Sequence, residues 1–168
     1  MLTRVVFIGK AGSGKTSAAE HLNQPGKPFL RVSFAEPLKY IAGLLWECPT
    51  RKHYLELGRK VREIDPDTWL NLALGKLKGK WYGIAIDDCR FPNEAEKLKE
   101  LGFVFIRINC PDETRKKRLK KRSGETDYKF FSDPSETLLD GWLCDYAIDG
   151  SLPLEEFLKE VEGVVYEE

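Results

Sequence analysis

Residues 5–16 read V-V-F-I-G-K-A-G-S-G-K-T, an apolar run followed by a glycine-rich loop with a lysine and a threonine. Residues 9–16 fit the pattern G-x-x-x-x-G-K-[ST] in full. Its glycines let backbone N–H groups converge on an anion, and a helix that begins there adds partial positive charge. A glycine-rich turn without function is the alternative. The complete pattern, with a buried strand before it and a helix after it, favours a loop that binds nucleotide phosphates.

This phosphate loop (residues 9–16) assigns different tasks to its last two side chains. Lys15 would reach the β- and γ-phosphates of ATP, and the hydroxyl of Thr16 would ligate Mg²⁺. The sequence therefore predicts ATP as phosphoryl donor with Mg²⁺ as cofactor. The predicted ATP-binding residues of this segment are Gly9, Ala11, Gly12, Ser13, Gly14, Lys15, Thr16 and Ser17.

A second acidic element is expected near the metal. Residues 83–88 read G-I-A-I-D-D, an apolar run that ends in two acids. The carboxyl ends of strands in open α/β sheets face the crevice where ligands bind. Counting four apolar residues before the acid favours Asp87 as the metal ligand. The alternative is that Asp87 or Asp88 only caps the next turn.

Short apolar runs alternate with longer amphipathic stretches along the whole chain. The predicted strands are continuous apolar runs, as in parallel strands covered on both faces, and lie at 4–8, 30–34, 82–86, 103–108 and 145–148. The predicted helices lie at 15–24, 36–47, 51–62, 67–78, 93–101, 112–122 and 154–162. Asp65 and Pro66 suit the start of one helix, Pro92 opens another, and Gly163 suits the end of the last. This alternation predicts an α/β three-layer sandwich with a five-stranded parallel sheet.

Composition narrows the class of protein. The 168 residues suit one domain. Lys plus Arg and Asp plus Glu number 27 each, a balance that argues against nucleic acid as the main partner. No apolar run approaches the roughly 20 residues that cross a bilayer, and the N-terminus lacks the pattern of a secretory signal. The four cysteines form no C-x-x-C pair. We therefore expect a reduced, cytoplasmic enzyme without a membrane partner.

Three further motifs follow along the chain: S-F-A-E-P-L-K at 33–39, an L-G-R…D-P-D-T-W stretch at 57–69 and D-C-R-F-P-N-E-A-E at 88–96. Together they resemble the motifs of the deoxynucleoside monophosphate kinases of the bacteriophage type. Residues 33–39, S-F-A-E-P-L-K, resemble the family's S-F-A-D-P-L-K, with Glu36 replacing its Asp. Residues 57–69 resemble its L-G-R-E…D-P-D-x-W stretch, and residues 88–96 its D-x-R-F-x-N-E-A-E stretch. The resemblance implies a P-loop nucleotide kinase that phosphorylates (deoxy)nucleoside monophosphates with ATP, in the host cytoplasm if a phage encodes it. It also implies one domain over 1–168, with acceptor-binding helices at about 34–80 and a helical lid at about 112–136.

A phosphate acceptor requires positive charge around it, because two anions must approach each other. Arg59 and Arg62 lie three residues apart on one predicted helix, although surface pairs with glutamates are an alternative. Arg90 follows the two acids. The resemblance aligns Asp88 with the family's acid, so Asp87 and Asp88 both remain metal candidates and Asp88 is preferred. The acceptor-binding residues that it implies are Phe34, Lys39, Arg59, Arg62, Trp69, Asp88 and Arg90, although Phe34 and Trp69 also suit a core.

Residues 115–122 contain seven basic residues out of eight. Arg115, Arg118 and Arg122 share one face of the predicted helix, whereas the lysines spread over the others. A solvated helix face and a nucleic-acid patch are the alternatives. The shared face resembles the lid of nucleotide kinases, which closes over ATP. Residues 123–134 follow this basic run and are the most loop-like long stretch of the chain, so we expect a mobile flap there.

The resemblance to nucleotide kinases also assigns individual roles. The catalytic residues that it implies are Lys15, Arg90, Arg118 and Arg122, and it adds to the ATP site Arg115, Gly150 and Ser151. The residues leave the base, the sugar and the oligomeric state open, with a homodimer among the states considered. The alternative functions are a same-fold kinase of a non-nucleotide phosphate such as phosphomevalonate, a regulatory P-loop NTPase and a nucleic-acid-dependent ATPase.

Overall fold

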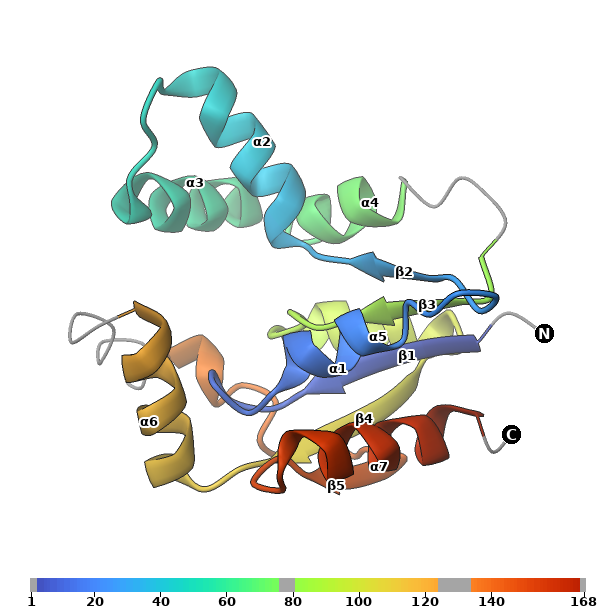
Figure 1. Ribbon diagram of the computed structural model, residues 1–168. Coiled ribbons are helices and arrows are strands. Elements are labelled where there is room, and N and C mark those ends of the chain that lie inside the picture. The colour runs from blue at the N-terminus through green and yellow to red at the C-terminus, as the bar shows by residue number, and fades with distance from the viewer. Residues whose placement is uncertain (1–2, 76–80, 124–133, 167–168) are drawn as a thin grey trace. The chain divides into compact units, whose positions relative to one another are not determined.

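The computed structural model describes residues 3–75, 81–123 and 134–166. Contacts along the chain define two compact units: unit 1 comprises Met1–Arg31 with Trp81–Glu168, and unit 2 comprises Val32–Lys80. Figure 1 labels the elements of each. In the part of the chain that the structure describes, no helix combines the length and apolar character needed to cross a membrane. The single domain expected over 1–168 stays a prediction.

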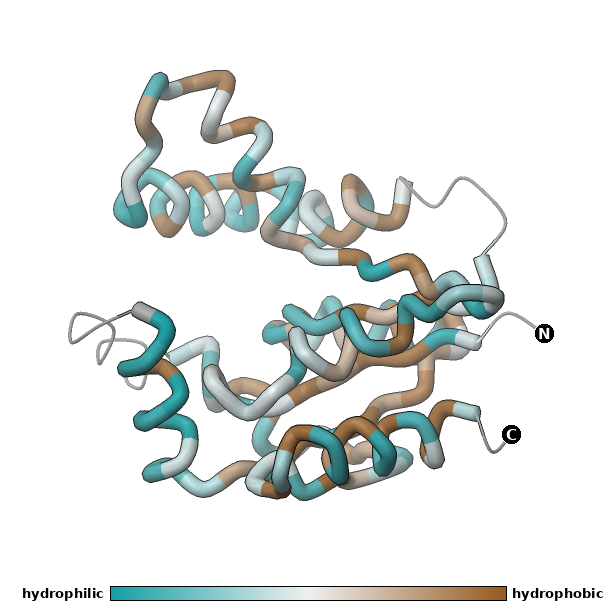
Figure 2. The backbone as a smooth tube through the Cα atoms, viewed as in Figure 1, coloured by the Kyte–Doolittle hydropathy of each residue, from teal (hydrophilic) through white to brown (hydrophobic). Residues whose placement is uncertain are grey.

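Unit 1 is built on a five-stranded parallel sheet with the strand order β2-β3-β1-β4-β5. The strands are β1 (Thr3–Ile8), β2 (Phe29–Val32), β3 (Gly83–Ile86), β4 (Val104–Asn109) and β5 (Tyr146–Asp149). Val5 in the central strand pairs with Ala85 on one side and Val104 on the other. Figure 2 shows that hydrophobic residues predominate along these strands, as expected for strands buried on both faces. The predicted sheet is confirmed.

Helices cover both faces of this sheet. They are α1 (Lys15–His21), α5 (Pro92–Glu100) and α7 (Leu154–Tyr166), and unit 1 also contains α6 (Asp112–Ser123) and the 3₁₀ turn η2 (Pro134–Glu136). The connections β1-α1-β2 and β3-α5-β4 run in opposite directions across the sheet, so right-handed crossovers place α1 and α5 on opposite faces. On the α1 face, Phe7 packs in one core with Ala18 of α1 and Val161 of α7. The predicted three-layer arrangement is therefore confirmed.

Unit 2 consists of three helices, α2 (Ala35–Leu45), α3 (Arg51–Ile64) and α4 (Thr68–Leu74). The buried indole of Trp69 donates a hydrogen bond to the carbonyl oxygen of Gly58 at 3.2 Å, which joins α4 to α3. A Cβ atom at Gly58 would lie 3.6 Å from Leu38 Cδ2, so α2 packs closely on α3 at this position. Trp69 is therefore a structural anchor within this unit.

Two predicted helix ends are wrong. Helix α4 has Asp67 as its N-cap and begins at Thr68, because Asp65 instead ends α3 and its Oδ1 accepts the Asp67 N–H at 3.0 Å. That local turn places the N-cap of the next helix at Asp67, two residues after the expected cap Asp65. Helix α7 continues past Gly163 to Tyr166, because Val165 extends the buried stripe of the helix by one further turn.

Other boundaries differ slightly from the sequence predictions. The strand expected at 30–34 ends at Val32, and Phe34 instead stands at the N-cap of α2. Of the helix expected at 67–78, residues 76–78 lie outside the described residues. The flap expected over 123–134 falls mainly on 124–133, which also lie outside them. Pro92 opens α5 as predicted.

Candidate phosphate-binding site

The phosphate loop joins β1 to α1 and depends on its glycines. Gly9, Gly12 and Gly14 have φ angles of 142°, 81° and 114°, a backbone conformation that side chains disfavour. A Cβ atom at Gly9 would also lie only 2.5 Å from the carbonyl oxygen of Ile108. Glycine is therefore required here both by conformation and by the close approach of β4.

The amine of Lys15 lies inside the loop. It donates hydrogen bonds to the carbonyl oxygens of Gly9 at 2.6 Å and of Lys10 at 3.0 Å. Burial lowers the pKa of Lys15 from its ordinary 10.5 to about 8, although the carboxylate of Glu136 opposes this shift. Because burial disfavours the protonated form of Lys15, an anion placed beside the amine stabilises that form.

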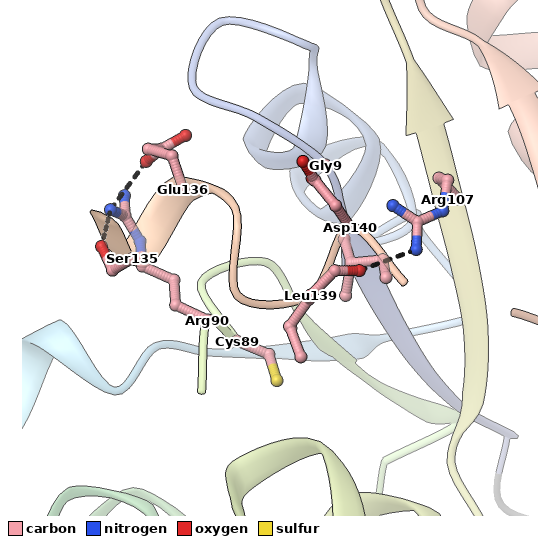
Figure 3. Close-up of a pocket in the computed structure, with 9 residues that line it drawn as sticks. Gly9, Cys89, Arg90, Arg107, Ser135, Glu136, Leu139 and Asp140 are labelled. Carbon is pink, nitrogen blue, oxygen red and sulfur yellow. Dashed lines mark hydrogen bonds and ion pairs between the residues drawn. The ribbon is translucent and has the colours of Figure 1, made fainter. Parts of the chain in front are cut away.

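Glu136 on η2 supplies such an anion, and the sequence patterns did not indicate it. The N–H of Ala11 donates to Glu136 Oε2 at 2.5 Å, and Arg90 Nη1 pairs with Glu136 Oε1 at 2.7 Å (Figure 3). The side chain of Glu136 is only 6% exposed. The loop is thus shaped to accept an oxyanion, and a carboxylate oxygen takes the place of a phosphate oxygen on the Ala11 N–H.

Two arginines hold the segment around Glu136. Arg90 also donates to the hydroxyl of Ser135 at 3.4 Å, and Arg107 donates to the carbonyl oxygens of Leu139 at 2.9 Å and Trp142 at 2.8 Å. Arg90, Arg107, Ser135, Glu136 and Leu139 line a small cavity of about 20 Å³ beside the loop (Figure 3). That volume suits one water molecule. We call residues 134–142 the strap.

The predicted lid arginines separate into two groups. Arg115 is buried and donates to the Ala11 carbonyl oxygen at 3.0 Å, and Arg118 donates to the Gly150 carbonyl oxygen at 2.7 Å and that of Ser13 at 3.4 Å. Helix α6 is thereby joined to the phosphate loop and to the turn after β5. Arg122, in contrast, is exposed. The structure places Arg115 and Arg118 against the phosphate loop and Arg118 also against Gly150, whereas Arg122 is at the surface of the helix, and the roles of all four toward ATP stay predictions.

A larger cavity of about 620 Å³ adjoins the loop. It extends from Gly9 and Lys10 along the end of β4 at Asn109 to Arg115 and Ser151. Cavities of this size hold small organic ligands. The hydroxyl and backbone N–H of Ser151 donate to Asp149 Oδ1 at 2.6 and 2.8 Å, which fixes the turn on this side.

The two acids after β3 differ in their surroundings. Asp87 is buried, and its Oδ1 and Oδ2 accept hydrogen bonds from Nε and Nη2 of Arg31 at 3.1 and 2.9 Å. Asp88 is half-buried. The sequence reasoning missed Arg31, whose signal is a charged residue within the otherwise apolar strand β2. One guanidinium thus engages both carboxylate oxygens of Asp87.

Two candidate acceptor arginines of unit 2 contact residues of their own helix. Arg59 pairs with Glu63 one turn along α3, and Arg62 Nη1 donates to the Gly58 carbonyl oxygen at 3.3 Å. Phe34 is buried, whereas Lys39 is exposed. Arg59 therefore forms a surface pair of the kind that the sequence also allowed.

The glycine-rich loop after the first strand and the parallel sheet define a nucleotide-binding P-loop protein with a kinase-like fold. Residues 5–138 match the family AAA_18, described as an AAA domain, and the chain belongs to that family. A shikimate kinase from Acinetobacter baumannii, solved in complex with shikimate, has a similar structure, with a TM-score of 0.63 and 14% identity. The match covers 99% of this chain and 94% of that one. This likeness concerns the fold.

Two relatives are similar in sequence. A protein of Acanthamoeba polyphaga mimivirus, whose name gives deoxynucleotide monophosphate kinase as a provisional assignment, is 29% identical over 70% of this chain and 81% of its own length. A UPF0200/UPF0201 protein of Archaeoglobus fulgidus is 24% identical over 96% of this chain. The chain spans 54% of the length of that archaeal relative.

Proposed function

We propose that this protein transfers the γ-phosphoryl group of ATP to a (deoxy)nucleoside monophosphate and releases the diphosphate and ADP. The observation that carries the proposal is the oxyanion site where the Ala11 N–H and Arg90 bind one buried carboxylate, whose charge also acts on the pKa of Lys15. The ordered kinase motifs of residues 9–96 and the name of the mimivirus relative support the acceptor class.

The chemistry needs little beyond positioning and charge neutralisation. An acceptor phosphate oxygen is already anionic near pH 7, so it can attack the γ-phosphorus in line without a general base. Lys15 and Arg118 would neutralise charge on the transferring group, while Arg90 would bind the acceptor phosphate. In unit 2 the proposed acceptor residues remain Phe34, Lys39, Arg59, Arg62 and Trp69.

The residues present fit a magnesium nucleotide. The loop already binds an oxyanion, and the exposed hydroxyl of Thr16 follows Lys15 directly. Among the described residues no group of three or more His, Cys, Asp or Glu is placed to hold a metal. Thr16 and Asp88, or Asp87, would therefore share Mg²⁺ with the phosphates themselves. When bound, the ion neutralises charge on the β- and γ-phosphates.

The test is an acceptor panel. The protein is incubated with ATP, Mg²⁺ and each of dAMP, dGMP, dCMP, dTMP and their ribose counterparts, and ADP release is followed by a coupled assay. We expect ADP release that depends on one or more of these monophosphates and that the Lys15→Ala variant does not show. ADP release that ignores every acceptor, or release only with a non-nucleotide phosphate, would overturn the proposal.

A further inference from the structure

Glu136 contacts two groups that the proposed reaction needs for two different phosphates. One carboxylate oxygen accepts the N–H of Ala11 in the phosphate loop, and the other pairs with Arg90. Ala11 and Arg90 lie on different connections of the sheet, after β1 and after β3. A single side chain thus bridges the donor side of the site and the arginine assigned to the acceptor phosphate.

The contact is not an incidental surface pair. The Glu136 side chain is 6% exposed, whereas the guanidinium of Arg90 is 37% exposed. Glu136 and Ala11 are 125 positions apart in the sequence, so the fold of the whole unit brings them together. The carboxylate also lies close enough to Lys15 to oppose the lowering of its pKa. A buried acid in contact with this many donors and cations is bound as an anionic ligand would be.

We propose that Glu136 is an internal ligand of the phosphate loop, that the phosphates of ATP displace it, and that its displacement releases Arg90 for the acceptor phosphate. This inference rests on the proposed function. It adds that Glu136 occupies the phosphate loop when ATP is absent, so that ATP binding also frees Arg90 to bind the acceptor phosphate.

Glu136 and a phosphate of ATP compete for the same hydrogen-bond donor in the loop. The Ala11 N–H carries one hydrogen, which Glu136 Oε2 accepts at 2.5 Å, so a phosphate oxygen that takes this hydrogen must replace the carboxylate. The apparent affinity for ATP is then reduced by the fraction of molecules in which Glu136 occupies the loop. Because binding couplings are reciprocal, an acceptor phosphate that removes Arg90 from Glu136 also favours ATP.

The strap can release Glu136 without leaving the protein. Its later part is held separately, because Arg107 donates to the carbonyl oxygens of Leu139 and Trp142. Lys10 pairs with Asp140 at 3.5 Å and adds a further contact beyond Glu136. Movement of Glu136 and the short turn η2 is therefore sufficient, and the rest of the strap keeps its place.

The first experiment measures binding without turnover. Isothermal titration calorimetry with inorganic pyrophosphate, and separately with Mg·ATP, compares the intact protein with its Glu136→Gln variant. We expect both ligands to bind about tenfold more tightly to the variant, because the charged competitor is gone. Glu160→Gln is the matched control, since it removes the same charge from an exposed position on α7 and should leave both affinities unchanged.

The second experiment tests the release of Arg90. Binding of the monophosphate that is active in the acceptor panel is titrated with and without a non-hydrolysable ATP analogue. In the intact protein the analogue should strengthen monophosphate binding about tenfold, whereas in Glu136→Gln this enhancement should largely disappear. Glu136→Asp keeps the charge but shortens the side chain, and should give intermediate values. It also provides a folded variant if Glu136→Gln proves unstable.

The outcomes separate this inference from the proposed function. Pyrophosphate that binds Glu136→Gln no more tightly than the intact protein, or more weakly, overturns the internal ligand, whatever the acceptor panel shows. Tighter pyrophosphate binding combined with ADP release that ignores every monophosphate supports the internal ligand and rejects the proposed acceptor. An enhancement by the ATP analogue that persists in Glu136→Gln rejects the release of Arg90.

Discussion

The arginines of the two units differ in the distance along the chain to their partners. In unit 1, Arg115 and Arg118 donate to phosphate-loop carbonyls 104 and 105 positions away, although Arg115 also pairs locally with Asp112 three positions before it. In unit 2, Arg59 pairs with Glu63 four positions along the same helix, and both side chains are largely exposed. Long-range buried bonds fix the shape of a loop, whereas an exposed pair within one helix is worth only a few tenths of a kcal/mol. Arg59 can therefore exchange its partner for a ligand at little cost, but Arg115 cannot.

The largest expected effect belongs to the loop that the unit 1 arginines hold. Lys15→Ala removes the amine that would neutralise the transferring phosphoryl group. We expect turnover in the coupled assay to fall by about 10³-fold or more, with the circular dichroism spectrum unchanged. Near-normal turnover in a folded variant would contradict the assignment of the phosphate loop.

Arg115→Met tests whether the long-range bonds stabilise the fold. The substitution keeps much of the buried chain but removes the hydrogen bond to the Ala11 carbonyl oxygen, together with the local pair with the exposed Asp112. We expect the free energy of unfolding in urea to fall by about 2 kcal/mol. Arg122→Met, on the exposed side of the same helix, is the control and should change it by less than about 0.5 kcal/mol. Equal losses of unfolding free energy in the two variants would show that the long-range bonds of Arg115 do not stabilise the fold.

The pKa of Lys15 predicts a pH dependence on the unit 1 side. Phosphate binding needs the protonated amine, and in the free protein the pKa of Lys15 is lowered to about 8 by burial. Affinity for ATP should therefore be full below pH 8 and should fall about tenfold for each pH unit well above it. Calorimetry between pH 7 and 9.5 measures this decline. A constant affinity over that range, or the same decline in Lys15→Ala, would show that another group is responsible.

The smallest expected effect on stability concerns unit 2. Arg59→Ala should change the free energy of unfolding by less than about 0.5 kcal/mol, because its pair with Glu63 is exposed. If Arg59 binds the acceptor, the KM for the monophosphate should nevertheless rise about tenfold. Lys52→Ala removes a cation of the same helix whose partner, Glu56, is also four residues away. An equal KM for the monophosphate in both variants would show that Arg59 does not bind the acceptor and only forms a surface ion pair.

The local patterns of the sequence predicted the sheet and the phosphate loop well. Continuous apolar runs identify the inner strands because these are covered on both faces, and the glycine spacing identifies the loop because the positive φ angles leave few other residues possible. Glu136 and Arg31 were missed. Their partners Ala11 and Asp87 lie 125 and 56 positions away, and no local pattern encodes a pairing across such distances. The wrong start of α4 has a different cause, a side-chain turn at Asp65 that competes with helix capping.

The packing of Gly150 has a consequence for how this protein is made. A Cβ atom there would lie 2.5 Å from the carbonyl oxygen of Ser13, so the turn after β5 touches the backbone of the phosphate loop. The loop at residues 9–16 precedes its supports at Arg115, Glu136 and Gly150 in the sequence, so these supports are synthesised later than the loop. During synthesis the nascent chain therefore carries the loop before it can hold it in shape, and we expect the loop to reach its final conformation only after Gly150 has emerged from the ribosome.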